Sequence, residues 1–143
     1  SLPEIQNPMI DAYLAALPEG RDPRILASRA VFVADDRQEA LRFAEVGVER
    51  FRARLAKAGR PTGDGSLESL IASLDIHLGT PSEVIASLQT DSALARSTEL
   101  AVQVHPVDPP HPYILRSIEM VAEVVAPALG WERGGAAGIR RVA

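Results

Sequence analysis

Hydrophobic and polar positions follow a helical period most clearly in residues 35–58. Apolar side chains recur there every three or four positions and form one stripe, made of Leu41, Ala44, Val48, Phe51 and Leu55. Asp36 and Glu39 resemble a capping box at the start of this segment, and Gly59 and Pro61 are typical of a helix end. The pattern therefore predicts a helix with one buried face and one face, rich in Arg and Glu, that meets water.

Two shorter segments carry continuous apolar runs instead of a helical period. Residues 25–34 are nearly all apolar, interrupted by Ser28 and Arg29, and residues 100–104 have the sequence Leu-Ala-Val-Gln-Val. Apolar runs of this length between turn residues favour strands that are covered on both faces. Because helices separate the two segments, we expect parallel strands joined by crossover connections, with further strands needed to cover their edges.

The remaining apolar patterns predict shorter helices. We expect them at residues 7–17, 66–74 and 112–129, and in a segment that begins with Thr80-Pro81-Ser82-Glu83. In the first of these helices, Asn7 is placed to act as the N-cap and Pro8 to occupy the first turn. We expect residues 1–130 to form one unit and residues 131–143 to be a flexible tail, with Trp131 as its anchor.

Composition and charge narrow the classes of function. The chain has 143 residues, of which 46% are hydrophobic and 24% charged, as is typical of a globular protein in water. A formal net charge of −4, with acids and bases interleaved, argues against a nucleic-acid partner, which requires a basic surface. The lack of cysteine excludes disulfides, thiolate metal sites and cysteine nucleophiles. No apolar run approaches the length of a membrane span, so we expect no membrane association and a cytoplasmic location.

Four segments, taken in order, resemble the bacterial-luciferase-like, flavin-dependent monooxygenases. The first is Val31-Phe32-Val33-Ala34-Asp35-Asp36 with Glu39-Ala40, which resembles the end of the seventh barrel strand in that family. The second, Gly79-Thr80-Pro81-Ser82-Glu83-Val84, is similar to the family's Gly-Thr/Asp-Pro-x-x-Val helix start. Residues 100–106 resemble the eighth strand, and residues 117–129 resemble the closing helix. The resemblance extends over most of the chain, and the order of the segments carries it.

The resemblance implies a fold and a cofactor. The family's fold is a (β/α)8 TIM-type barrel that binds FMN or a related flavin at the carboxyl ends of its strands. This chain would be the C-terminal portion of such an α/β barrel, helix-rich and about two β/α units long. Its first residue is serine and not methionine, which we take as a minor sign of a processed or cleaved fragment. The parent would oxidise a small organic substrate with reduced flavin and oxygen, and we expect the fragment itself to be inactive.

Three residues are candidates for the cofactor or substrate side of a site. His105 ends its predicted strand, where a barrel faces its active site; the alternative is a ring that packs under the proline-rich loop. Gln103 points to the same side, either as a polar group inside the barrel or as a buried amide bonded to backbone. Arg29 lies in a buried strand, where an unpaired charge is costly. We favour a structural ion pair for Arg29 over an anion site, and we assign no catalytic residue because the family's catalytic positions lie upstream.

A metal site is not expected. His105 and His111 flank the proline-rich loop with no carboxylate at metal-ligand spacing beside them, and helix capping accounts for Asp35 and Asp36. The alternative function is a small α/β interaction or self-association domain without catalysis, and either hypothesis leads us to expect a homo-oligomer. Adjacent parallel strands with one open apolar face favour the barrel fragment. A self-contained sheet with covered edges favours the interaction domain.

Overall fold

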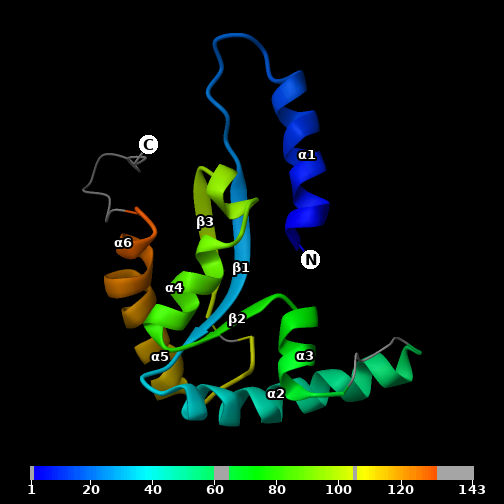
Figure 1. Cartoon of the computed structure of the whole chain (residues 1–143), viewed down its shortest axis with the longest axis vertical. Helices are drawn as coiled ribbons and strands as arrows, with labels where there is room; N and C mark the ends of the chain where they lie inside the picture. The colour runs from blue at the N-terminus through cyan, green and yellow to red at the C-terminus, as the bar shows by residue number, and fades with distance from the viewer. Residues whose placement is uncertain (1, 60–64, 105, 132–143) are drawn as a thin grey trace.

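The computed structural model consists of a parallel sheet with helices around it (Figure 1). The structure describes residues 2–59, 65–104 and 106–131. In chain order the elements are α1 (Leu2–Ala16), β1 (Leu26–Val33), α2 (Arg37–Lys57), α3 (Leu67–Ser73), β2 (Ile76–Gly79), α4 (Pro81–Gln89), the 3-10 turn η1 (Leu94–Arg96), β3 (Glu99–Gln103), α5 (His111–Met120), the π-helical turn η2 (Val121–Val125) and α6 (Ala126–Ala128).

The sheet has three strands in the order β2-β1-β3, and all neighbours are parallel. Ala30 of the central strand lies opposite Ile76 of β2 and Gln103 of β3. The two strands predicted from apolar runs, β1 and β3, are therefore confirmed as adjacent and parallel. Strand β2 was not predicted, so the expectation of about two β/α units is one strand short.

Helices pack on both faces of the central strand. Alternate side chains of β1 point to opposite sides of the sheet, so they enter two separate hydrophobic clusters. On one face, Ala27, Val31 and Val33 join a cluster with α4, η1, α5 and η2, whose other buried members are Val84, Leu88, Leu94, Met120 and Val125. On the other face, Phe32 and Ala34 join a cluster with α2, α3 and the loop after β3, whose other buried members are Ala40, Ala44, Val48, Leu70, Ile71 and Val107. The protein thus has two layers of core, one on each side of the sheet.

The order of the strands explains this arrangement. The chain moves from β1 to β2 in one direction through α2 and α3, and then back past β1 to β3 through α4. Right-handed crossovers that run in opposite directions place their helices on opposite faces of a sheet. In a (β/α)8 barrel, consecutive strands are neighbours and every helix lies outside. The order β2-β1-β3 therefore differs from that of consecutive barrel strands and is the order found in doubly wound sheets.

One part of the sheet remains uncovered. Helices α2 and α3 pack on the carboxyl-terminal end of their face, and they leave exposed Leu26, Ser28, Ala101 and Gln103. Leu26 has 63% of its surface accessible, although it is a large apolar residue. We call these four residues the open half-face.

Helix α1 begins earlier than the sequence indicated. It starts at Leu2, so Asn7 and Pro8 lie inside the helix and the prediction of Asn7 as N-cap is wrong. The side chain of Asn7 instead donates to the hydroxyl of Ser92 and accepts from Arg96. Only Ile10 of α1 is buried. Polar contacts therefore contribute much of the attachment of α1, which lies beside β1 (Figure 1).

The carboxyl-terminal part of the chain forms one continuous helical stretch from α5 to α6. Beyond it, the backbone N–H of Trp131 donates to the carbonyl of Ala126 at 2.9 Å. The predicted tail, residues 131–143, lies outside the described residues except for Trp131. Within the described ranges, no helix has the length and apolarity that crossing a bilayer requires.

Candidate functional site

The carboxyl ends of the parallel strands are the edge at which α/β proteins form their sites. In this protein β1, β2 and β3 end at Val33, Gly79 and Gln103. The backbone ladder continues one step past β1, because the N–H of Ala34 donates to the carbonyl of Gly79 at 2.9 Å. The segments that follow these strand ends therefore form the candidate site.

The exit from β1 carries an exposed ion pair. Arg116 of α5 donates to both carboxylate oxygens of Asp35, from Nε at 3.2 Å and from Nη2 at 2.9 Å. The hydrogen bond from Arg116 lowers the pKa of Asp35, and its positive charge adds to this effect. The next residue, Asp36, caps α2 by accepting from the N–H of Gln38 at 2.9 Å, as its predicted role requires.

The exit from β2 is a tight turn into α4. Gly79 has φ of 145°, a conformation that side chains rarely adopt, and an added Cβ would collide with the side chain of Glu83. The carboxylate of Glu83 accepts from both the N–H and the hydroxyl of Thr80 at 2.9 Å, which completes the predicted capping box. The hydrogen bond from the Thr80 N–H is the main reason that the pKa of Glu83 is lowered. Arg37 of α2 binds the same carboxylate at 3.2 Å.

These contacts limit the chemistry of the edge. Two ion pairs occupy four of its described charges: Asp35 with Arg116, and Glu83 with Arg37. Both carboxylates are held in the ionised form, so neither is a proton donor near neutral pH. Within the described ranges, no group of His, Asp and Glu side chains is arranged to hold a metal ion. The edge can position a ligand, but its described residues provide no activated nucleophile.

Gln103 ends β3 and belongs to the open half-face. Its side chain is exposed, so the alternative of a buried amide is wrong. His105, the other candidate at this strand end, lies outside the described residues. In the parallel register Gln103 is opposite Ala30, whereas Arg29 is opposite Val102. Gln103 and Arg29 therefore point to opposite faces of the sheet, and the structure does not bring them together.

Arg29 is buried on the helix-covered face, with 1% of its surface accessible. Its guanidinium donates to both carboxylate oxygens of Asp91, from Nε at 2.5 Å and from Nη2 at 3.1 Å. It also donates to the side chain of Gln6 and to the carbonyl of Ser28, each at 2.8 Å. The structural ion pair favoured by the sequence is present, and no donor is directed at an open anion site in these contacts.

Sequence reasoning missed the partners in these networks. Asp91 lies two residues after the end of α4, and its Oδ1 accepts from the N–H groups of Ala93 and Leu94, a turn geometry that Asp commonly initiates. Ser117 of α5 is fully buried, and its hydroxyl accepts from the N–H of Val33 at 3.0 Å. The signal for Asp91 was its position before a short turn. Ser117 had no such signal.

No protein-family model and no curated protein matches the chain. Among solved structures, the chain is similar to a type II Baeyer-Villiger monooxygenase, the oxygenating constituent of 3,6-diketocamphane monooxygenase from the CAM plasmid of Pseudomonas putida, in complex with FMN. The identity is 25% and the TM-score 0.57, over 85% of this chain. This chain spans 39% of the length of that protein. The likeness supports the luciferase-like flavin monooxygenases as the group to which the fold is related.

Proposed function

We propose that this chain is the carboxyl-terminal part of a luciferase-like, FMN-dependent oxidoreductase. The parent protein oxidises a small organic substrate, and its flavin supplies the reactive centre. The observation that carries the proposal is the structural likeness to an FMN-containing monooxygenase over 85% of this chain at 25% identity. The ordered motifs from Val31 to Leu129 point to the same group independently of the fold.

The proposal also states that this chain is only part of a barrel. A barrel enzyme encloses its cofactor with loops from most of its strands, and this chain spans 39% of the related protein. The open half-face agrees with this, because Leu26 and Ala101 are apolar residues that a complete barrel would cover. The expectation that the isolated chain is inactive stays part of the proposal.

The described residues of the carboxyl edge do not fit a flavin by themselves. A flavin phosphate requires free N–H groups at a helix start or arginines without other partners. Here Glu83 already accepts from the N–H of Thr80, and Arg37 and Arg116 are bonded to Glu83 and Asp35. No flavin step follows from these residues alone, so we propose that the phosphate and ring contacts come from residues outside the described ranges, including the rest of the parent protein.

A second candidate function rests on the strand order. A sheet ordered β2-β1-β3 with helices on both faces buries the carboxyl-terminal half of its own central strand, as a self-contained module does. We propose self-association through the open half-face as the function in that case. This alternative requires no flavin.

A flavin-binding experiment distinguishes the two proposed functions. The 143-residue chain and the complete product of its gene are each dialysed against FMN, and the bound flavin is measured by its visible absorbance. We expect the complete product to bind FMN in a one-to-one ratio and the 143-residue chain to retain none. Stoichiometric FMN binding by the 143-residue chain would contradict the proposal that this chain is only part of the flavin site. A complete product that binds no flavin would end the oxidoreductase proposal and favour the interaction module.

A further inference from the structure

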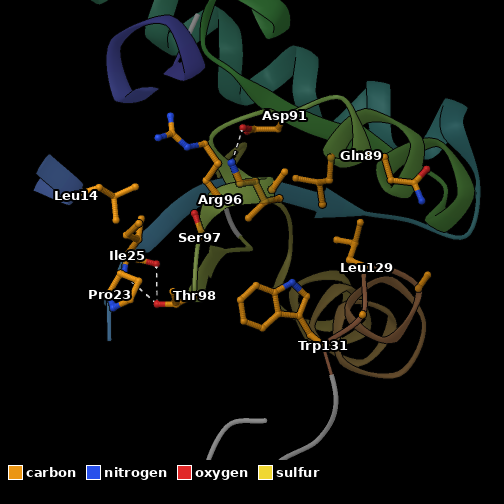
Figure 2. Close-up of a pocket in the computed structure, with 15 residues that line it drawn as sticks. Leu14, Pro23, Ile25, Gln89, Asp91, Arg96, Ser97, Thr98, Leu129 and Trp131 are labelled. Atoms are coloured by element: carbon orange, nitrogen blue, oxygen red, sulfur yellow. Dashed lines mark hydrogen bonds between the residues drawn. The ribbon is translucent and has the colours of Figure 1, made fainter. Parts of the chain in front are cut away.

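A cavity of about 590 Å³ lies at the amino ends of β1 and β3, at the sheet edge opposite the candidate site (Figure 2). Its walls come from the approach to β1, the end of α4, the segment from η1 to β3, and the end of α6. Cavities of about 300–1,000 Å³ are the usual size for small-molecule sites. The cavity is therefore large enough for a ligand of drug-like size, and it lies at the sheet edge opposite the one where barrel enzymes form their active sites.

The walls of this cavity are mixed, with only slightly more apolar than polar surface. Ile25, Leu88, Leu94 and Leu129 contribute aliphatic surface, and Trp131 contributes the widest flat surface. Figure 2 shows the indole of Trp131 between Leu129 on one side and Thr98 on the other. A second cavity of about 250 Å³, lined almost entirely by apolar residues, shares Leu88, Leu129 and Trp131 as walls. The apolar space thus extends from the indole toward the core between β3 and η2.

The charged groups on the walls are already satisfied. Asp91 is bonded to Arg29 inside the protein, and Arg96 donates to Asp11 and to Asn7 of α1. The hydroxyl of Thr98 accepts from the N–H of Ile25 at 2.8 Å. An ionised ligand would lose its hydration here without gaining a free counter-charge, which disfavours it. Among the described residues on the walls, the amide of Gln89, which can donate and accept, and the indole N–H of Trp131, which can donate, remain for a ligand.

From this combination we propose that the amino-edge cavity binds a neutral, flat, mostly aromatic small molecule that stacks on Trp131 and carries a hydrogen-bonding group toward Gln89. The proposal does not depend on the flavin proposal, because the two sites lie at opposite edges of the sheet. It would hold equally for an isolated interaction module.

The protein contains its own reporter for this site, since Trp131 is the single tryptophan of the sequence. The probe is N-phenyl-1-naphthylamine, a neutral aromatic dye whose emission rises in apolar surroundings. Excitation of the indole should give saturable quenching of Trp131 and matching dye emission by energy transfer, at one dye per chain. The anionic dye 1-anilinonaphthalene-8-sulfonate should bind at least ten-fold more weakly. Equal or tighter binding of the sulfonate would overturn the assignment of a neutral ligand.

Two variants fill the cavity without touching the core. Ala95 and Ala128 are exposed alanines on its walls, so Ala95→Phe and Ala128→Phe should each weaken the neutral dye at least ten-fold. The matched control is Ala86→Phe, the same change at an exposed alanine of α4 that lines neither cavity. Circular dichroism establishes that each variant is folded. Loss of binding in the two filled variants alone supports the site. Equal affinity in all three variants, or quenching that never saturates, would refute it.

Discussion

Arg29 and Asp91 are 62 positions apart in the chain and form a two-point ion pair inside the protein. Arg29 comes from the central strand, and Asp91 comes from the turn after α4. The same guanidinium donates to the side chain of Gln6 of α1 at 2.8 Å. One side chain therefore connects three separate segments of the chain: α1, β1 and the turn after α4. Because α1 buries a single residue, Ile10, this hydrogen bond and those from Arg96 to Asn7 and Asp11 contribute much of the attachment of α1.

Replacement of Asp91 by alanine should be strongly destabilising. It leaves Arg29 buried and unpaired, and it also removes the acceptor for the N–H groups of Ala93 and Leu94. Breaking a buried ion pair by removing one partner costs about 3–5 kcal/mol, and we expect a loss in this range in urea unfolding monitored by circular dichroism.

The control for this prediction is Asp11→Ala, which breaks the exposed pair between Asp11 and Arg96. Exposed pairs contribute about 0–1 kcal/mol, so this variant should unfold close to the wild type. If Asp91→Ala costs no more than Asp11→Ala, the buried pair does not stabilise the contact between β1 and the turn after α4 as described.

His77 should make stability depend on pH in a narrow window. Burial lowers the pKa of His77 below its usual 6.5, and the positive charge of Arg29 acts in the same direction, whereas Asp91 and Asp75 oppose it. The unfolded chain therefore binds this proton before the folded protein does, so the free energy of unfolding decreases as pH falls below 6.5. The decrease ends once the folded protein is protonated as well.

The titration of His77 is measurable by NMR of its imidazole, assigned by its disappearance in His77→Gln. We expect a midpoint below 6.5 and a flatter stability profile between pH 7 and 5 in the variant. The carboxylates of Asp35, Glu83 and Asp91, whose pKa values are lowered, act in a more acidic window and leave this comparison intact. A midpoint above 6.5 would mean that burial does not dominate at His77.

Gly47 should not tolerate a side chain. It lies in α2 where the helix meets the loop after β3, and an added Cβ would overlap the carbonyl group of Val107. Alanine is the better helix former, so propensity alone would favour Gly47→Ala. We expect the overlap to prevail and to cost about 1–3 kcal/mol, because a packed backbone yields little. Val46→Ala, at the exposed neighbouring position, should change the free energy of unfolding by only about 0.5 kcal/mol. Greater stability of Gly47→Ala would show that the loop moves freely.

Local patterns were enough to predict elements whose own residues carry the signal. The apolar stripe of α2, the run of β1 and the Thr80–Glu83 box each predicted the structure that is found. Strand β2 was not predicted because it has only four residues, one of them the polar His77, and so lacks an apolar run. It forms a strand through pairing with the end of β1. The strand order was not predicted either, because the position of β2 in the sheet determines which face each helix covers.

The candidate site was harder to predict than the fold because its contacts join distant segments. Arg29 signalled that it needed a partner, but nothing local identified Asp91 or Gln6. The prediction that helix capping accounts for Asp35 is wrong, because Asp36 alone is the N-cap of α2. The carboxylate of Asp35 binds Arg116 instead, and that bond depends on where α5 docks. A charged residue in an apolar run predicts that a partner exists, and only the tertiary structure says which one.

Self-association should depend on the open half-face. Leu26 is the large apolar residue of that surface, and burying a leucine contributes about 1.5–3 kcal/mol. Leu26→Glu should therefore raise the dimer dissociation constant by about ten-fold or more, measured by analytical ultracentrifugation across a concentration series. Leu115→Glu is the matched control, because Leu115 is 48% exposed on α5, away from the open half-face. We expect it to leave the dissociation constant unchanged. A wild-type chain that stays monomeric at every concentration would contradict self-association through the open half-face. An equal rise of the dissociation constant in both variants would contradict it as well, and would favour a surface that the rest of a barrel covers.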